Sequence, residues 1–229
     1  MLTDVEDLLG RMPVFAGLSD EARGALAERL SRRPERRSSV VFEEGEPGDR
    51  VFLILAGKVK ISRRSTDGRE NLLAVLGPGD IFGELSLFDP GPRSATVTAV
   101  TDATFLSLSH EDLLRWLDGR PAVARGLLNQ LAVRLRKAND VVADLVFSDV
   151  PGRVAKALLD LADRFGRTAD DGVHVHHDLT QEELAQLVGA SRETVNKALA
   201  DFASRGWLRL DGKSVIILDP ERLARRARV

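Results

Sequence analysis

The segment at positions 83–94, with the sequence GELSLFDPGPRS, brings together groups that can hold a phosphorylated ligand. Backbone N–H groups around Gly83–Ser86, the guanidinium of Arg93 and the hydroxyl of Ser94 can all donate to phosphate oxygens. The carboxylate of Glu84 is an acceptor suited to a ribose hydroxyl. A carboxylate and an arginine nine residues apart are also typical of a surface ion pair, so the spacing alone leaves both interpretations open.

A second set of functional side chains lies on a helix predicted to follow Ser191. Arg192, Glu193, Asn196 and Lys197 fall on one face of that helix, opposite an apolar face. Arginine and lysine can donate to guanine O6 and N7 in the major groove of DNA, and glutamate can accept from cytosine N4. A solvated charged face has the same composition, so the surrounding elements have to decide between the two interpretations.

Those elements predict a helix-turn-helix. Thr180-Gln181-Glu182-Glu183 is a capping-box pattern at the start of a helix that runs to Val188. Gly189 can take the left-handed conformation that ends a helix, and Ser191 can cap a second helix that runs to about Ser204. The candidate DNA-binding residues are Thr180, Gln181, Ser191, Arg192, Glu193, Thr194 and Lys197.

A hairpin is predicted after this pair of helices. Trp207–Leu210 and Ser214–Leu218 flank Asp211-Gly212-Lys213, and an Asp-Gly pair between two apolar runs favours a hairpin. This hairpin is expected to be the wing of a winged helix-turn-helix domain. The chain then carries a basic tail that indicates either a solvated end or phosphate contacts, made of Arg222, Arg225, Arg226 and Arg228.

The first half of the chain predicts a β-roll or barrel. Eight of the 19 glycines fall in the 47 residues from 45 to 91. Short β-type runs lie between and after them, at Val51–Leu55, Val59–Arg63, Leu72–Leu76, Ala95–Val100 and Thr104–Leu108. Ahead of these runs, Ser19 is expected to cap a short helix, and RRPERR at 32–37 is interpreted as a solvated turn.

Between these two parts, apolar residues recur at alternating spacings of 4 and 3. They are Ala124, Leu128, Leu131, Leu135, Ala138, Val142 and Leu145. This heptad pattern with charged outer positions, Arg134 among them, favours the seam of a parallel homodimer, although a helix packed on its own domain produces the same pattern. Pro121 suits the first turn of the helix, and Phe147–Pro151 interrupts the pattern, which predicts a hinge and a domain boundary near residue 148.

Composition excludes several functional classes. The 229-residue chain has no cysteine, which excludes disulfides, thiolate zinc sites, cysteine-bound iron–sulfur clusters and cysteine nucleophiles. With 33 basic and 35 acidic residues the net charge is −2, so DNA binding must depend on local placement of cations. No apolar run approaches the roughly 20 residues that span a bilayer, and the N-terminus lacks a signal-peptide pattern, so a cytoplasmic protein without a membrane partner is expected.

The sequence contains no pattern typical of an enzyme site. His174, His176 and His177 have no further ligand nearby and are expected to lie on an edge strand beside the wing, so no metal site is predicted. Ser109 and His110 belong to a run of catalytic-triad residue types, but neighbouring positions at a helix start cannot converge and instead indicate a helix cap.

Taken together, the two motifs resemble those of one protein family. GELSLFDPGPRS is similar to the phosphate-binding cassette of cyclic-nucleotide-binding domains. LTQEELAQLVGASRETVNKALADFASRG at 179–206 is similar to the helix-turn-helix of the cyclic-AMP receptor protein (catabolite activator) family. EEGEPGDR at 43–50, DGRENLLAVLGPGD at 67–80 and DLVFSDVPGR at 144–153 resemble the actinobacterial branch of that family. The resemblance extends over roughly residues 10–225.

The resemblance implies an α+β chain with three parts. These are an N-terminal β-roll cyclic-nucleotide-binding domain at 1–120, a dimerisation helix at 121–147 and a C-terminal winged helix-turn-helix domain at 148–229. It implies cyclic AMP as an allosteric ligand. In the β-roll, Glu84 is expected to meet the ribose 2′-hydroxyl. The residues implied to hold the cyclic phosphate are Gly83, Leu85, Arg93 and Ser94, and Ser86 is a further candidate ligand-binding residue of the same segment.

Two departures from the family pattern affect its ligand and its DNA. The family's usual pair of hydroxyl residues at the adenine aligns with Ala138 and Asn139, so only Asn139, from the same or the partner subunit, keeps hydrogen-bonding capacity. Arg192, Glu193 and Lys197 align with the base-reading residues. Lys197 replaces an arginine found in many relatives, which relaxes the preference for guanine.

The predicted function is a homodimeric transcriptional regulator, not an enzyme, that is controlled by cyclic AMP and reads a near-palindromic operator. Its predicted partners are double-stranded DNA, a second copy of the chain and RNA polymerase. The alternative is the same DNA-binding dimer acting constitutively or with a different ligand, and Ala138 favours it. A third hypothesis is a cyclic-nucleotide module that acts on a protein partner, and the helix-turn-helix argues against it.

Overall fold

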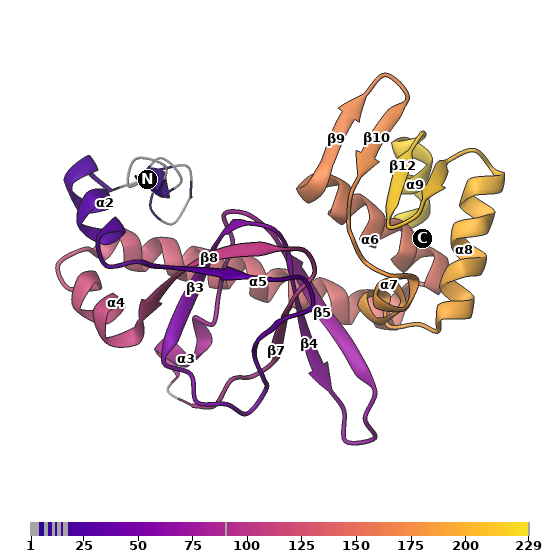
Figure 1. Ribbon diagram of the computed structural model, residues 1–229. Coiled ribbons are helices and arrows are strands. Elements are labelled where there is room, and N and C mark those ends of the chain that lie inside the picture. The colour runs from indigo at the N-terminus through magenta and orange to yellow at the C-terminus, as the bar shows by residue number, and fades with distance from the viewer. Residues whose placement is uncertain are drawn as a thin grey trace. The chain divides into compact units, whose positions relative to one another are not determined.

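The structure is a computed structural model that describes residues 5–6, 9–10, 12, 15, 18–89 and 91–228, except for the side chains of Leu87 and Phe88. The chain forms two compact units (Figure 1), one of residues 1–63 and 75–138 and the other of residues 64–74 and 139–229. We call them the N-terminal unit and the C-terminal unit.

A β-roll of two four-stranded sheets, with strand orders β1-β8-β3-β6 and β2-β7-β4-β5, makes up most of the N-terminal unit, although residues 64–74, which include most of β5, are grouped with the C-terminal unit. The strands are β1 (Ser31–Glu35), β2 (Val40–Phe42), β3 (Arg50–Ala56), β4 (Val59–Arg64), β5 (Glu70–Leu76), β6 (Ile81–Phe82), β7 (Thr96–Ala99) and β8 (Ala103–Ser109). Three short helices accompany them, α2 (Asp20–Ala27), α3 (Leu85–Phe88) and α4 (His110–Leu117). The predicted β-roll is confirmed.

Four phenylalanines join the two sheets of the β-roll. Phe52 and Phe82 stack with ring centroids 5.0 Å apart, and Phe105 meets Phe82 edge-on at 5.3 Å. Phe42, from the second sheet, lies 5.9 Å from both Phe52 and Phe82. Such aromatic contacts add to the free energy gained by apolar burial. The cluster therefore stabilises the packing of the two sheets next to the 83–94 segment, whose Arg93 contacts the Phe42 ring.

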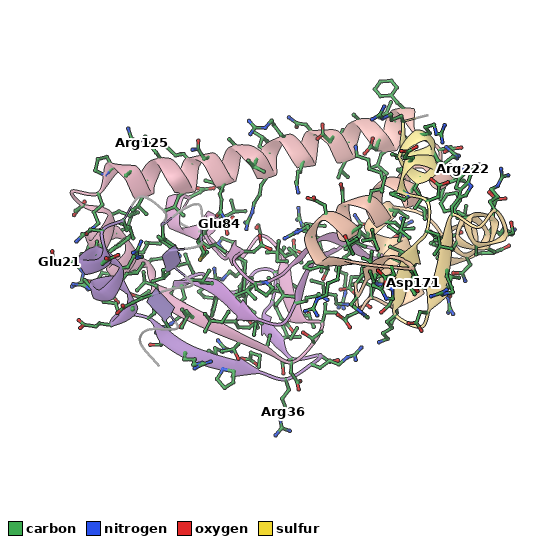
Figure 2. All side chains as sticks on the ribbon, turned by 90° about the horizontal axis from the view of Figure 1, so that it is seen from above. Glu21, Arg36, Glu84, Arg125, Asp171 and Arg222 are labelled. Atoms are coloured by element: carbon green, nitrogen blue, oxygen red, sulfur yellow. The ribbon has the colours of Figure 1, made fainter. Side chains whose placement is uncertain are left out.

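The prediction of a solvated turn at 32–37 is wrong. Residues 31–35 form strand β1, which pairs antiparallel with β8 from Ser31 opposite Ser107 to Glu35 opposite Ala103. Most side chains of β1 are exposed, so the strand has no apolar alternation for sequence reasoning to detect. Its backbone pairing with the apolar strand β8 is what makes it a strand, and Arg36 beyond its end projects away from the sheet (Figure 2).

Helix α5 (Pro121–Phe147) is the predicted long helix. Val123 and Leu127 are buried in the N-terminal unit, and neither belongs to the predicted heptad seam. The seam residues Leu128, Leu135 and Val142 are exposed along another face of the helix. One face of α5 therefore packs on its own unit, while an apolar face has no cover within the described part of the chain.

The C-terminal unit combines α6 (Val150–Phe165) with a helix pair and a four-stranded sheet of order β11-β12-β10-β9. The pair is α7 (Gln181–Val188) and α8 (Arg192–Ser204), and the strands are β9 (Gly166–Ala169), β10 (Gly172–Val175), β11 (Leu208–Asp211) and β12 (Ser214–Ile217). The predicted winged helix-turn-helix is confirmed. No helix within the described ranges is long and apolar enough to cross a membrane.

One expectation for the C-terminal unit is wrong, and the basic tail forms a helix. Strand β10, which carries His174, is an inner strand between β12 and β9, not an edge strand. The basic tail is helix α9 (Pro220–Ala227), which packs along α6 (Figure 1) and buries Leu223 completely. Asp219 caps this helix and Pro220 occupies its first turn. This Asp-Pro pair, directly before the arginines, is a sequence pattern that indicates the start of a helix.

Candidate functional site

The 83–94 segment folds so that Arg93 approaches the backbone of Gly83 closely. Gly83 has φ of +79°, and a Cβ at this position would lie 2.8 Å from Arg93 Nη1 and 3.0 Å from the carbonyl oxygen of Arg50. Any other residue is therefore both strained and obstructed here. A Cβ at Gly48 would overlap the Ser86 hydroxyl in the same way. Two glycines thus create the space that the guanidinium and the serine occupy.

Arg93 is a buried cation, with only 5% of its surface exposed. Its Nη1 donates to the Gly83 carbonyl and to Ser86 Oγ, both at 3.0 Å, and its Nη2 donates to the Arg50 carbonyl at 2.9 Å. The guanidinium carbon lies 4.2 Å from the ring centroid of Phe42. Arg93 Nε is buried without a hydrogen bond to any described group. Neutral carbonyls and a ring surround the charge, and this environment is complementary to an anion.

Burial lowers the pKa of Arg93, and the carboxylates of Asp49, Glu46 and Glu84 oppose that shift. An arginine stays protonated despite such a change, so the site carries a fixed positive charge. Within the described residues Arg93 forms no ion pair. A buried charge without a counter-ion is costly, and a bound phosphate would remove that cost.

Glu84 is also buried, at 6% exposed, and lies beneath α5 (Figure 2). Its Oε1 pairs with Arg134 Nη1 at 2.5 Å, and Arg134 also donates to the carbonyl of Ile81. The interpretation of Glu84 and Arg93 as a surface ion pair is therefore wrong, because both are buried and each has other partners.

Sequence reasoning missed Arg134, which it treated as a charged outer position of the heptad. The signal was its spacing from Val123 and Leu127, which are the two residues that α5 buries in its own unit. Positions 123, 127 and 134 share one helix face, so Arg134 had to point toward the β-roll. It completes the site by neutralising Glu84.

The other predicted ligand residues lie in different environments. Ser86 is buried against Arg93, whereas Leu85 and Ser94 are exposed. Pro90, inside the same motif, lies outside the described residues. Asn139 is exposed on α5, in the C-terminal unit. The structure therefore brings together Gly83, Glu84, Ser86 and Arg93, with Arg134 added.

His110 lies beside this site. Ser109 caps α4 by accepting from the Asp112 N–H at 3.1 Å, so the run of triad residue types is a helix cap as predicted. His110 donates its backbone N–H to the Asp49 carbonyl at 2.9 Å, and its Nε2 is buried without a partner in the described chain. Burial lowers the pKa of His110, the positive charge of Arg93 lowers it further, and Asp49 and the Gly83 backbone oppose the shift.

We expect His110 to make the β-roll less stable in acid. Its folded pKa lies below the ordinary value of about 6.5, so the unfolded state binds more protons and stability is lost as the pH falls through that value. Urea unfolding at pH 7.5 and at pH 5.5 gives the free energy of unfolding that each protein loses on acidification. This loss should be smaller for His110→Gln than for the wild type, and the difference should stay below about 1.4 kcal/mol per pH unit. His176→Gln, at an exposed histidine, is the control, and equal losses in wild type and His110→Gln would contradict the expectation.

The helix-turn-helix has the predicted caps. Thr180 Oγ1 accepts from the Glu183 N–H at 3.1 Å while Glu183 Oε2 accepts from the Thr180 N–H at 2.7 Å. Gly189 is left-handed, with φ of 63° and ψ of 47°, and Ser191 Oγ accepts from the Thr194 N–H at 3.2 Å. These local bonds fix where α8 starts, and so fix which of its side chains face outward.

Helix α8 buries an apolar face and exposes a polar one. Arg192, Glu193, Thr194 and Lys197 are exposed, and Lys197 Nζ pairs with Glu193 Oε1 at 2.8 Å. Asn196 was expected on the same exposed face, but it is half-buried with its Oδ1 fully enclosed, so that expectation is wrong. The exposed set offers donors and an acceptor of the kinds that read base edges.

The wing is tied to the start of α7. The turn of the β11–β12 hairpin uses Gly212 at φ of +58°, and the carbonyl of Lys213 accepts from the Asp178 N–H at 3.0 Å. Thr180 and Gln181 are both exposed just after this bond. This bond therefore connects the segment before α7 to the turn of the wing. Groups of three or more His, Cys, Asp or Glu side chains able to hold a metal ion are absent from the described residues.

Comparisons with known proteins agree with one candidate site in the β-roll and another in the helix-turn-helix. Residues 33–120 match the cyclic nucleotide-binding domain family, and residues 152–226 match the Crp-like helix-turn-helix domain family. The chain is 57% identical over 224 residues to the CRP-like cAMP-activated global transcriptional regulator of Mycobacterium tuberculosis, covering 98% of this chain and 100% of that one. It is 38% identical over 198 residues to the cyclic AMP receptor protein of Thermus thermophilus, covering 86% and 88% of the two chains.

Solved structures agree with the fold. The c-di-GMP responsive global regulator CLP of Xanthomonas campestris aligns with a TM-score of 0.76 and 26% identity, over 87% of this chain and 99% of that one. The catabolite activator protein of Thermus thermophilus aligns with a TM-score of 0.54 and 37% identity, over 94% and 98%.

Proposed function

Because this chain belongs to the cyclic-AMP receptor protein family of transcriptional regulators, we propose that it binds cyclic AMP in its β-roll and reads a near-palindromic operator as a homodimer. The observation that carries the ligand proposal is the buried guanidinium of Arg93, which has no ion pair among the described residues and lies in one short segment with the buried carboxylate of Glu84. An anion with hydroxyl groups beside it matches that pair, and a ribose cyclic phosphate is such a ligand.

Arg93 keeps two N–H donors that can bind the cyclic phosphate of the proposed ligand. A guanidinium has five N–H groups, and the three bonds to Gly83, Ser86 and Arg50 use two on Nη1 and one on Nη2. The N–H on Nε and one N–H on Nη2 stay free for phosphate oxygens. The backbone near Gly83 and the exposed hydroxyl of Ser94 add further donors on the same segment.

A ribose hydroxyl at Glu84 has to share that carboxylate with Arg134. The carboxylate has two oxygens and several lone pairs, so it can accept from a hydroxyl while it keeps its bond to Arg134 Nη1. Because Arg134 belongs to α5, the ligand and the long helix would then bind the same carboxylate. Linkage limits the effect of the ligand on α5 to its difference in affinity between two arrangements of the helix.

Calorimetric titration of the purified protein with cyclic AMP, cyclic GMP and cyclic di-GMP tests the ligand. We expect heat and saturation with cyclic AMP. The alternative of a constitutive or differently controlled dimer is favoured by Ala138, which leaves Asn139 as the one polar residue of the pair expected at the adenine. Operator affinity is then measured at fixed salt with and without saturating cyclic AMP. Equal affinities would support that alternative. Ala138→Thr is expected to strengthen both nucleotide binding and its coupling to DNA.

On DNA, we propose that Arg192, Glu193 and Lys197 read bases, while Thr180, Gln181, Ser191 and Thr194 hold the backbone. A two-fold dimer would place two copies of α8 one turn of DNA apart, about 34–36 Å, and the resemblance suggests half-sites like TGTGA. We include RNA polymerase among the partners and the cytoplasm as the location, as for a regulator that acts at promoters.

Arg192→Ala is expected to lose about 1–3 kcal/mol of binding at one guanine position and to flatten the base preference there. Lys213→Ala, in the exposed turn of the wing, is the matched control. It should weaken binding to all sequences alike and reduce the slope of log affinity against log salt by about one for each subunit. Binding titrations against a set of single-base operator variants at two salt concentrations measure both effects. An unchanged preference in Arg192→Ala would remove this residue from base reading.

A further inference from the structure

The hinge between α5 and α6 consists of two residues. Helix α5 ends at Phe147 and α6 begins at Val150, so Ser148 and Asp149 make the connection. Asp149 has an extended conformation, with φ of −74° and ψ of 166°, and its Oδ1 caps α6 by accepting from the Gly152 N–H at 2.9 Å. This carboxylate therefore helps to fix the direction in which α6 leaves the hinge.

The second oxygen of that carboxylate binds an arginine from the far end of the sequence. Asp149 Oδ2 accepts from Arg226 Nη2 at 2.5 Å. The side chain of Arg226 is only 22% exposed, whereas that of Asp149 is 57% exposed. The hydrogen bond from Arg226 is the main reason why the pKa of Asp149 is lowered, with burial opposing it. We call this contact the hinge clamp.

Arg226 is carried by a packed helix, not by a loose tail. Leu223 lies one turn earlier on α9 and is completely buried. The start of the helix is fixed by Asp219, whose carboxylate accepts from the Arg222 N–H at 3.0 Å and whose own N–H binds the carbonyl of Trp207 at 3.0 Å. The hinge clamp therefore connects Asp149 to the folded body of the DNA-binding domain.

The other side of the hinge is bound to the turn of the helix-turn-helix. Arg153 donates to the carbonyl of Ser148 at 2.8 Å, to that of Val188 at 2.9 Å and to that of Gly189 at 3.3 Å. Each hinge residue is thus held by one arginine. Arg153 connects Ser148 to the turn before α8, and Arg226 connects Asp149 to α9.

We propose that Arg226 is a positioning residue for operator recognition, which acts through Asp149 and not through contact with DNA. This inference rests on the proposed function, because it requires a dimer that reads two half-sites. In such a dimer the distance between the two α8 helices depends on the conformation of both hinges. A clamped hinge holds one distance, and a loosened hinge samples several, so binding to a fixed operator then costs more conformational entropy.

The test compares two duplexes that carry TGTGA and its inverted repeat, one with the normal spacer and one with a spacer longer by one base pair. Wild-type protein should prefer the normal spacer. Arg226→Ala should bind the normal duplex about 3- to 10-fold more weakly, the size expected when two partly exposed ion pairs per dimer are lost. It should bind the longer duplex about as well as the wild type does, so its discrimination between spacers falls.

The salt dependence separates this role from a phosphate contact. A lost clamp leaves the slope of log affinity against log salt unchanged, whereas a lost phosphate contact lowers it by about one for each subunit. Arg225→Ala is the matched control, because Arg225 is exposed on the same helix and has no ion pair with a described residue. It should leave spacer discrimination as it is.

Asp149→Asn provides a second variant in case Arg226→Ala unfolds the domain. Asparagine keeps the cap of α6 but loses the charge that Arg226 binds, so spacer discrimination should again fall. Discrimination that is unchanged in both folded variants, or a lower salt slope in Arg226→Ala, would overturn the clamp. A wild-type protein that binds neither duplex specifically would overturn the proposed function instead.

Discussion

Replacing Arg93 with alanine is expected to lower the affinity for cyclic AMP by about 30-fold or more, equivalent to roughly 2–5 kcal/mol for the loss of a charge-assisted bond to a buried phosphate. The loss is large because Arg93 is buried at 5% exposed and no other basic side chain occurs in the 83–94 segment. Calorimetric titration of wild type and variant measures it. Light scattering should find the same dimer in both.

Stability has to be measured beside affinity, because Arg93 also holds the carbonyls of Gly83 and Arg50. Arg93→Met keeps most of the volume over the Phe42 ring and removes an uncompensated buried charge, so urea unfolding of this variant should change little. Arg50→Ala is the matched control, since its exposed side chain leaves the carbonyl that binds Arg93 in place. Cyclic AMP affinity that is unchanged in both Arg93 variants would remove this residue from the site.

The parts of the molecule that could be predicted from the sequence are those whose signals are local. A capping box at Thr180, a left-handed glycine at Gly189 and a cap at Ser191 each act within a few residues, so the helix-turn-helix follows from its own sequence. The same holds for the wing, where an Asp-Gly pair makes the turn.

Features that depend on distant contacts could not be predicted in this way. Strand β1 is polar and owes its conformation to β8, which follows more than 60 residues later. Arg134 is 50 residues from Glu84, and Arg226 is 77 residues from Asp149. In the two arginine cases, a charged side chain with the sequence pattern of an ordinary surface residue binds a partner that only the fold brings close. The candidate ligand site and the hinge each contain such an arginine.

The exposed face of α5 leads to the second large effect. Leu128, Leu135 and Val142 repeat every seven residues and are 59%, 64% and 62% exposed. Val146 continues the same face at 69% exposed, one helical turn beyond Val142. Large apolar side chains in a continuous row indicate an interface, and the heptad spacing fits a parallel pairing of two identical helices.

Leu135→Glu is therefore expected to convert the proposed dimer into monomers. In a two-fold interface the change places two carboxylates in the apolar centre, where their desolvation and mutual repulsion oppose association. The monomer keeps a single recognition helix and loses the second half-site, so operator affinity should fall by about 100-fold or more. Light scattering measures the mass, and a titration with the palindromic duplex measures the affinity.

Val133→Glu is the matched control for this change. It introduces the same charge on the same helix, two residues before Leu135, and Val133 is already 44% exposed. Two residues correspond to about 200° around an α-helix, so the new carboxylate lies on the face away from the row. We expect Val133→Glu to stay dimeric and to bind the operator. If Leu135→Glu stayed dimeric as well, the row on α5 would not be the dimer interface. The two copies would then associate through another surface, and that surface would set the distance between the two α8 helices.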